Sequence, residues 1–207
     1  MRVVHFGHAC VLLDTGSTRL LIDPGIFSAG FEEVTDLDAV LITHQHFDHL
    51  DLDKLPALLK RNPKAQLITD SGSAAQVENA RVATPGEVIK IGGASVRVVG
   101  GEHAVIHRDI PIVPNTGYVI DDGAFYHPGD SLFVPDEDVD VLGLPTGAPW
   151  LKLGEAVDFL REIAPRVAVP IHEKVLAMPQ MAYTQFENLR PDGTTVTLLP
   201  PGEETEV

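Results

Sequence analysis

The chain has little cysteine, few basic residues and no long apolar segment, and each of these absences excludes a class of protein. Cys10 is the single cysteine among 207 residues, so no disulfide can form within the chain and the fold does not depend on an oxidising compartment. Cys10 lies in an apolar run, where a buried structural thiol is expected rather than a nucleophile. No apolar run approaches the roughly 18 residues of a membrane-spanning helix, and no secretory signal is visible. We therefore expect a cytoplasmic protein without a membrane span.

Basic residues are outnumbered by acidic ones, with 15 Lys and Arg against 30 Asp and Glu and a formal net charge of -15. This balance argues against nucleic acid as a partner, because a phosphate backbone attracts Lys and Arg. A small anionic substrate is still compatible with it, since a bound dication can dominate the field inside a site. The apolar fraction of 44% is ordinary for a protein with a buried core. The length predicts one domain over residues 1–207.

Short apolar runs separated by turn residues indicate strands through most of the chain. Two pairs of runs flank Gly92-Gly93 and residues 121–123, which predicts two β-hairpins. Along the chain, strands come first in hairpins and then alternate with helices, and this order occurs twice. Such an order predicts two sheets packed face to face, with helices on the outside.

Helices are predicted where apolar residues recur at helical spacing. One covers residues 55–59 with Asp53 as its N-cap, and another covers residues 155–164. A short helix is expected over residues 73–79. The acidic tail over residues 200–207 is expected to be loose.

The most informative segment is Thr43-His44-Gln45-His46-Phe47-Asp48-His49, which directly follows the apolar run 39–42. Neutral imidazole and carboxylate groups suit zinc, manganese or iron. A strand that ends in such a loop can hold a metal, because the strand is rigid and the loop can curl around an ion. The alternative is a polar surface loop that happens to be rich in histidine.

Three further apolar runs also lead into metal-competent residues. Residues 95–99 are followed by His103, residues 124–126 by Asp130, and residues 167–169 by His172. In layered folds, the strand ends at one edge of a sheet converge on a shared pocket. Four such strand ends are much stronger evidence for a metal site than one.

The candidate ligands are too many for one zinc ion, which takes three or four protein ligands. They suffice for two metals if one carboxylate bridges, and Asp130 is the natural bridge because it is a compact carboxylate just past a glycine. Two ions about 3.5–4 Å apart could hold a hydroxide between them and lower its pKa toward neutrality, which would make it the nucleophile. The candidates are His44, His46, Asp48, His49, His103, Asp130 and His172.

The His-x-His-x-Asp-His signature makes the chain similar to the metallo-β-lactamase superfamily. It resembles in particular the branch that includes ascorbate-6-phosphate lactonase-like and phospholipase D-type metal-dependent hydrolases. The likeness runs from residue 1 to about residue 175. The stretches that carry the closer likeness are 5–9, 21–25, 115–118 and 127–130.

The resemblance implies an α+β fold, a four-layer αββα sandwich with two divalent metals at one sheet edge. It implies that Asp130 bridges the metals and that Asp48 also orients the attacking hydroxide, which makes these two the expected catalytic residues. Zinc is the expected ion, with manganese or iron as alternatives. The implied ligands are His44, His46 and His103 for the first metal, and Asp48, His49 and His172 for the second.

These expectations together predict a hydrolase that uses a dimetal-bound hydroxide to cleave a small ester, lactone or phosphodiester. One alternative is an iron-dependent oxidoreductase on the same fold, although a diiron flavoprotein of the superfamily would carry Glu in place of His46. The other is a non-catalytic metal-binding module, which lost ligands would favour, and none is missing here.

Other polar residues could support the site or contact the substrate. Asp23 is expected to hold a ligand imidazole by its second nitrogen, with turn formation as the alternative. His8 lies at a strand boundary where the family places a histidine near the pocket, and a buried, hydrogen-bonded histidine is the alternative. His107 could contact an anionic leaving group or belong to a solvated loop. Trp150 could line the pocket or serve only in packing. His127 is expected to be structural.

Overall fold

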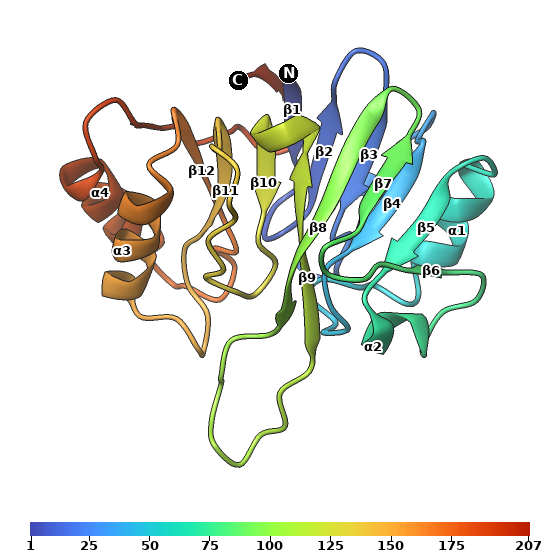
Figure 1. Cartoon of the computed structure of the whole chain (residues 1–207), viewed down its shortest axis with the longest axis horizontal. Helices are drawn as coiled ribbons and strands as arrows, with labels where there is room; N and C mark the ends of the chain where they lie inside the picture. Colours follow the sequence, from blue (N-terminus) through green and yellow to red (C-terminus); the bar gives the residue numbers. More distant parts are fainter.

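A computed structural model describes all 207 residues of the chain. Fourteen strands form two sheets of seven that pack face to face (Figure 1). The first sheet contains β1 (Arg2–His5), β2 (Val11–Asp14), β3 (Arg19–Ile22), β4 (Ala39–Ile42), β5 (Gln66–Thr69), β6 (Arg81–Val82) and β14 (Glu204–Glu206), in the order β14-β1-β2-β3-β4-β5-β6. The second contains β7 (Val88–Ile91), β8 (Ala94–Glu102), β9 (Pro114–Ile120), β10 (Phe125–His127), β11 (Val141–Pro145), β12 (Val167–Ile171) and β13 (Thr195–Val196), in the order β13-β12-β11-β10-β9-β8-β7.

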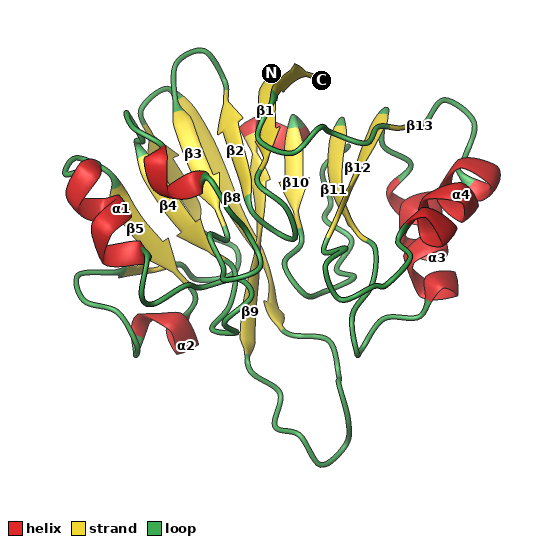
Figure 2. Ribbon diagram, turned by 180° about the vertical axis from the view of Figure 1, so that it is seen from behind, coloured by secondary structure: helices red, strands yellow, loops and turns green.

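Helices lie outside both sheets (Figure 2). The helices beside the first sheet are η1 (Phe31–Glu33), α1 (Leu55–Arg61) and α2 (Ser71–Ala74). Those beside the second are α3 (Leu153–Ile163) and α4 (Gln180–Leu189), and a short turn, η2 (Asp121–Gly123), joins β9 to β10. The predicted four-layer αββα sandwich is therefore confirmed. None of these helices combines the length and the apolar content needed to cross a membrane.

The alternation of side chains along the strands divides the core into three layers. Along β3, Leu20 and Ile22 belong to the central layer between the sheets, whereas Leu21 packs in the layer that includes Leu58 of α1. Along β12, Ala168 packs toward α3 and α4, and its neighbours on the strand face the first sheet. Each sheet is thus covered on both faces, which explains the near-continuous apolar runs in the sequence.

Strand direction brings the functional loops to one edge. In the second sheet β9 is antiparallel to both β8 and β10, and β10, β11 and β12 are parallel, so β8, β10 and β12 all end at the same edge. In the first sheet β1, β3 and β4 run in one direction because β2 is antiparallel to β1 and β3. The loop over residues 103–113 extends beyond the sheets at the lower edge in Figure 1.

The predicted cap of α1 and the predicted bounds of the short helix are wrong, although α1 begins at Leu55 as predicted. Asp53 does not cap α1; the Asp51 carboxylate accepts hydrogen bonds from the backbone N–H of Asp53 and of Lys54, both at 3.0 Å. The short helix covers Ser71–Ala74 rather than residues 73–79, because Asp70 accepts from the first backbone N–H groups and fixes an earlier start.

The C-terminal tail is not loose as predicted. Residues Glu204–Glu206 form β14, which pairs antiparallel with β1, so that Val3 lies opposite Thr205. The partner strand is about 200 residues away in the chain, so no local pattern could indicate the pairing. Helix α4 was not predicted either.

Tyr118 joins the two sheets directly beneath the loop that follows β4. Its ring is fully buried, and its hydroxyl donates a hydrogen bond to the Ile42 carbonyl at 2.7 Å. Tyr118→Phe should therefore lower the free energy of unfolding by about 1–3 kcal/mol, because a buried carbonyl loses its partner. Urea denaturation of this variant and of Tyr183→Phe, a control in the half-buried part of α4, measures the difference. Equal stability losses in the two variants would contradict the conclusion that the Tyr118 hydroxyl joins the two sheets.

Candidate metal centre

The loop after β4 is held against the loop after β3 by backbone contacts. The Ile26 N–H donates to the Phe47 carbonyl at 2.9 Å, and the Asp51 N–H donates to the Pro24 carbonyl at 3.0 Å. A Cβ atom on Gly25 would overlap the backbone of Asp48, so only glycine allows this close approach. The sequence Asp23-Pro24-Gly25 thereby sets the path of the histidine-rich loop.

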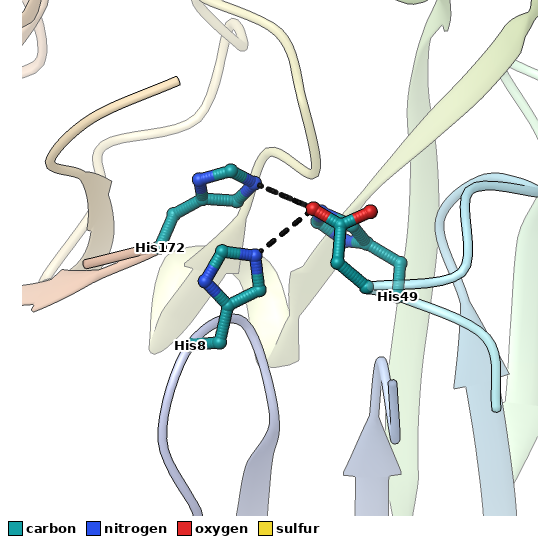
Figure 3. A group of neighbouring side chains, drawn as sticks. His8, His49 and His172 are labelled. Atoms are coloured by element: carbon teal, nitrogen blue, oxygen red, sulfur yellow. Dashed lines mark hydrogen bonds and ion pairs between the residues drawn. The ribbon is translucent and has the colours of Figure 1, made fainter. Parts of the chain in front are cut away.

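Eight histidine and aspartate side chains converge at this edge in two groups. Within each group the potential ligand atoms all lie within 4.8 Å of one another. The structure brings together all seven residues named as candidate ligands and adds His8 to them. Figure 3 shows three members of one group, His8, His49 and His172. The first group is His44, His46, His103 and Asp130; the second group is His8, Asp48, His49 and His172.

Asp130 lies between the two groups and presents one oxygen to each. Its Oδ1 lies 3.1 Å from Nε2 of both His49 and His172, in the second group. Its Oδ2 lies 3.3 Å from Nε2 of His103, in the first group, and accepts a hydrogen bond from Nε1 of Trp150 at 2.7 Å. The backbone N–H of Asp130 donates to Oδ1 of Asn115 at 3.0 Å. Hydrogen bonds therefore fix both the backbone and the carboxylate of Asp130.

Asp23 holds one imidazole in each group. Its Oδ2 accepts from Nδ1 of His49 at 2.7 Å and from the Thr43 hydroxyl, also at 2.7 Å. The same hydroxyl oxygen lies 3.0 Å from Nδ1 of His44 and accepts its proton. One buried carboxylate thus orients two rings, with their Nε2 atoms facing the site.

Two other imidazoles are oriented by backbone carbonyls. Nδ1 of His172 donates to the Gly147 carbonyl at 2.7 Å, and Nδ1 of His103 donates to the Ala104 carbonyl at 2.5 Å. Both rings therefore also turn Nε2 toward the site. His46 instead faces inward with Nδ1, which lies 3.1 Å from Nε2 of His44.

The inward-facing atoms fit a pair of cations. Nε2 of His49 lies 3.1 Å from Nε2 of His172, although both rings already donate through Nδ1. The buried Nε2 of His103 and Oδ1 of Asp130 have no hydrogen-bond partner. Lone pairs that converge in this way are satisfied by protons or by metal ions, and a mixed imidazole and carboxylate set suits zinc and related ions.

The protonation of the site follows from burial and from the carboxylates. Burial lowers the pKa of His44 far below its usual value and also lowers that of His46. Burial would do the same to His172, but the Asp130 carboxylate outweighs it and raises the pKa of His172 to about 9. The pKa of His49 is raised in the same way by Asp130 and Asp23. In the absence of metal, protons therefore occupy positions that cations would take.

The remaining candidates divide into those at the site and those outside it. Trp150 contacts Asp130 directly, which the sequence left undecided. His127 is buried, with Nε2 donating to the Ala9 carbonyl at 2.9 Å and Nδ1 accepting from the Gly129 N–H. The side chain of His107 is 58% exposed and lies beside Asp109, away from both groups. Sequence reasoning missed Thr43, although its place directly before His44 was a signal.

The comparisons with known proteins agree with this geometry. Residues 2–172 match the model of the beta-lactamase superfamily domain. A protein of Mycobacterium tuberculosis is 48% identical, over 95% of this chain and 100% of the relative, and a Pyrococcus horikoshii protein named a metal-dependent hydrolase is 27% identical, over 100% of both. A metallo-beta-lactamase fold protein of Bacillus subtilis has a crystal structure with a TM-score of 0.74 at 17% identity, covering 99% of this chain and 98% of that one. The predicted fold family is confirmed.

Metal affinity should rise with pH up to about 9, because His172 must lose its proton before it can bind a cation. Proton release on zinc binding is measured by calorimetry at each pH in two buffers of different ionisation enthalpy. An affinity that stays constant between pH 6 and about pH 9, with no proton released, would contradict the assignment of His172 as a metal ligand.

Replacing Asp23 tests the shared support of the two groups. Asp23→Asn keeps the size of the side chain but puts an N–H donor where two donors now converge, so both His44 and His49 should lose their orientation. We expect the affinity for both ions to fall roughly 10–100-fold. Competition with a chelator measures both affinities, and Asp36→Asn, at an exposed turn, serves as the control. A fall in affinity for only one of the two ions would contradict the shared role of Asp23.

Proposed function

Because the chain belongs to the beta-lactamase superfamily, we propose that it is a metal-dependent hydrolase with two divalent cations, zinc by preference. The observation that carries the proposal is the position of Asp130, which turns one carboxylate oxygen toward each of two histidine-rich groups. A single-ion site would not need two separate sets of inward-facing nitrogens.

The proposal assigns each group to one ion and Asp130 to both. When bound, two such metal ions would lower the pKa of a water molecule and polarise a carbonyl or phosphoryl oxygen of the substrate. Other residues of the chain orient the side chains that would surround the two ions. Trp150 restrains Asp130, and Asp23 fixes two of the rings. The proposed ligands are His44, His46 and His103 for one ion, and Asp48, His49 and His172 for the other.

Asp48 is the proposed catalytic carboxylate beside the bridging Asp130. Burial raises the pKa of Asp48, but hydrogen bonds from His172 and His8 outweigh burial and hold that pKa well below its usual range. Asp48 therefore stays ionised at neutral pH, and its carboxylate can accept a hydrogen bond that orients an attacking water molecule.

The proposed substrate is a small ester, lactone or phosphodiester, and an anionic compound is compatible with two cations. Support for the lactonase-like and phospholipase D-type branch comes from where the matching stretches lie. Residues 5–9 carry His8, residues 21–25 carry Asp23, and residues 127–130 carry Asp130, so these stretches converge on the centre. Phe27 and Phe47 are partly exposed beside it and give its rim an apolar side.

Removal of His103 tests the ligand assignment. His103→Ala should lose at least one zinc ion per chain and most hydrolytic activity, because the first group keeps only two imidazoles. Metal content is measured by elemental analysis after dialysis, with His107→Ala as the matched control from the same loop, which should keep the metal content of the natural chain. A His103→Ala protein that retains two ions would rule out the assignment.

The activity itself is tested by a screen of lactones, phosphodiesters and thioesters with the zinc-loaded and manganese-loaded protein. Hydrolysis that requires metal supports the proposal. Two bound ions without hydrolysis of any of these compounds, together with oxygen consumption by an iron-loaded sample, would favour the oxidoreductase instead.

A further inference from the structure

His8 belongs to the second group by position, but its ring is held differently from those of the proposed ligands. Its Nε2 lies 3.0 Å from Oδ2 of Asp48, and its Nδ1 is buried without a hydrogen-bond partner (Figure 3). By contrast, Nδ1 of His49 and Nδ1 of His172 each donate to an oxygen outside the site. A histidine that binds a metal almost always donates its other N–H in this way.

The protonation of the His8 ring follows from its partner. A carboxylate can only accept, so Nε2 of His8 carries the proton and donates it to Asp48. A neutral imidazole carries a single N–H. Coordination through Nε2 would move that proton to Nδ1, where it would be buried without an acceptor. The energetically favoured role of Nε2 is therefore donation to Asp48.

The backbone of His8 is fixed by contacts of its own. The His8 carbonyl accepts from Nε2 of His5 and from the backbone N–H of His172, both at 2.8 Å. The His8 N–H donates to Oε1 of Glu173 at 3.1 Å. These contacts hold His8 at a φ of 55°, and its ring packs edge-on against Phe27 with centroids 5.1 Å apart. His8 follows β1 and His172 follows β12, so the ends of these two strands place the Nε2–H group of His8 beside His172.

We propose that His8 is a positioning residue that holds Asp48 by a hydrogen bond and is not a metal ligand. This inference rests on the proposed function, because Asp48 is taken there as a ligand and a catalytic group. Its consequence is that the ion of the second group gains no ligand from His8, which keeps a coordination position open for water or substrate, as catalytic sites require.

The tautomer of His8 tests the inference directly. In long-range proton–nitrogen NMR spectra of histidine-labelled protein, with the His8 signals assigned from their loss in His8→Gln, the proton should lie on Nε2 both without metal and with zinc. A proton on Nδ1 in the zinc-loaded protein would overturn the inference. The metal-free spectrum is decisive by itself if zinc does not bind, because a proton on Nδ1 there would exclude the hydrogen bond to Asp48.

Two substitutions separate positioning from ligation. His8→Gln places an amide donor near the position of Nε2, and His8→Gly removes the ring at a backbone angle that glycine adopts without strain. Both variants should bind two zinc ions per chain, His8→Gly should lose roughly 10–100-fold in kcat/KM, and His8→Gln should recover most of that loss. Loss of one ion from both variants, while the natural chain binds two, would overturn the inference. A natural chain that binds no zinc would contradict the proposed function instead.

Discussion

The Asp130 carboxylate, buried between two sets of imidazoles, is the group on which the rest of the site depends. A carboxylate that is only 4% exposed costs several kcal/mol to bury unless positive charge or strong donors surround it. Here the nitrogens of His49 and His172 face one oxygen, and those of His103 and Trp150 face the other. Protons on His49 and His172 compensate the charge in the metal-free protein, and two cations would compensate it better.

The fold supplies the rigidity that such a site requires. Strands that run in one direction within each sheet place the ends of β1, β3, β4, β8, β10 and β12 at one edge, and the sheets are joined there by side chains such as Tyr118. Short loops then fix each group. Gly25 lets one loop touch the backbone of Asp48, and Gly129 allows Asp130 to follow a tight turn against Thr43 and Asn115. The atoms proposed to bind the ions are therefore held in place before any ion binds, which lowers the cost of binding one.

Much of the candidate site could be predicted, because the residues that could bind metal lie directly after apolar runs. Each of His44, His103, Asp130 and His172 follows a strand that the sequence indicated, so their convergence followed from the layered fold. What could not be predicted depends on contacts distant in sequence. The hydrogen bond from Trp150 to Asp130 and the pairing of β14 with β1 leave no local pattern. The tautomer of His8 likewise follows from its contact with Asp48, 40 residues away, and from no feature of its own segment.

The most direct test of the central claim is anomalous X-ray scattering at the zinc edge from crystals of the zinc-loaded protein. Two peaks about 3.5–4 Å apart, with the Asp130 carboxylate between them, are the expected result. A single peak, or two peaks too far apart for one carboxylate to reach both, would contradict the dimetal centre.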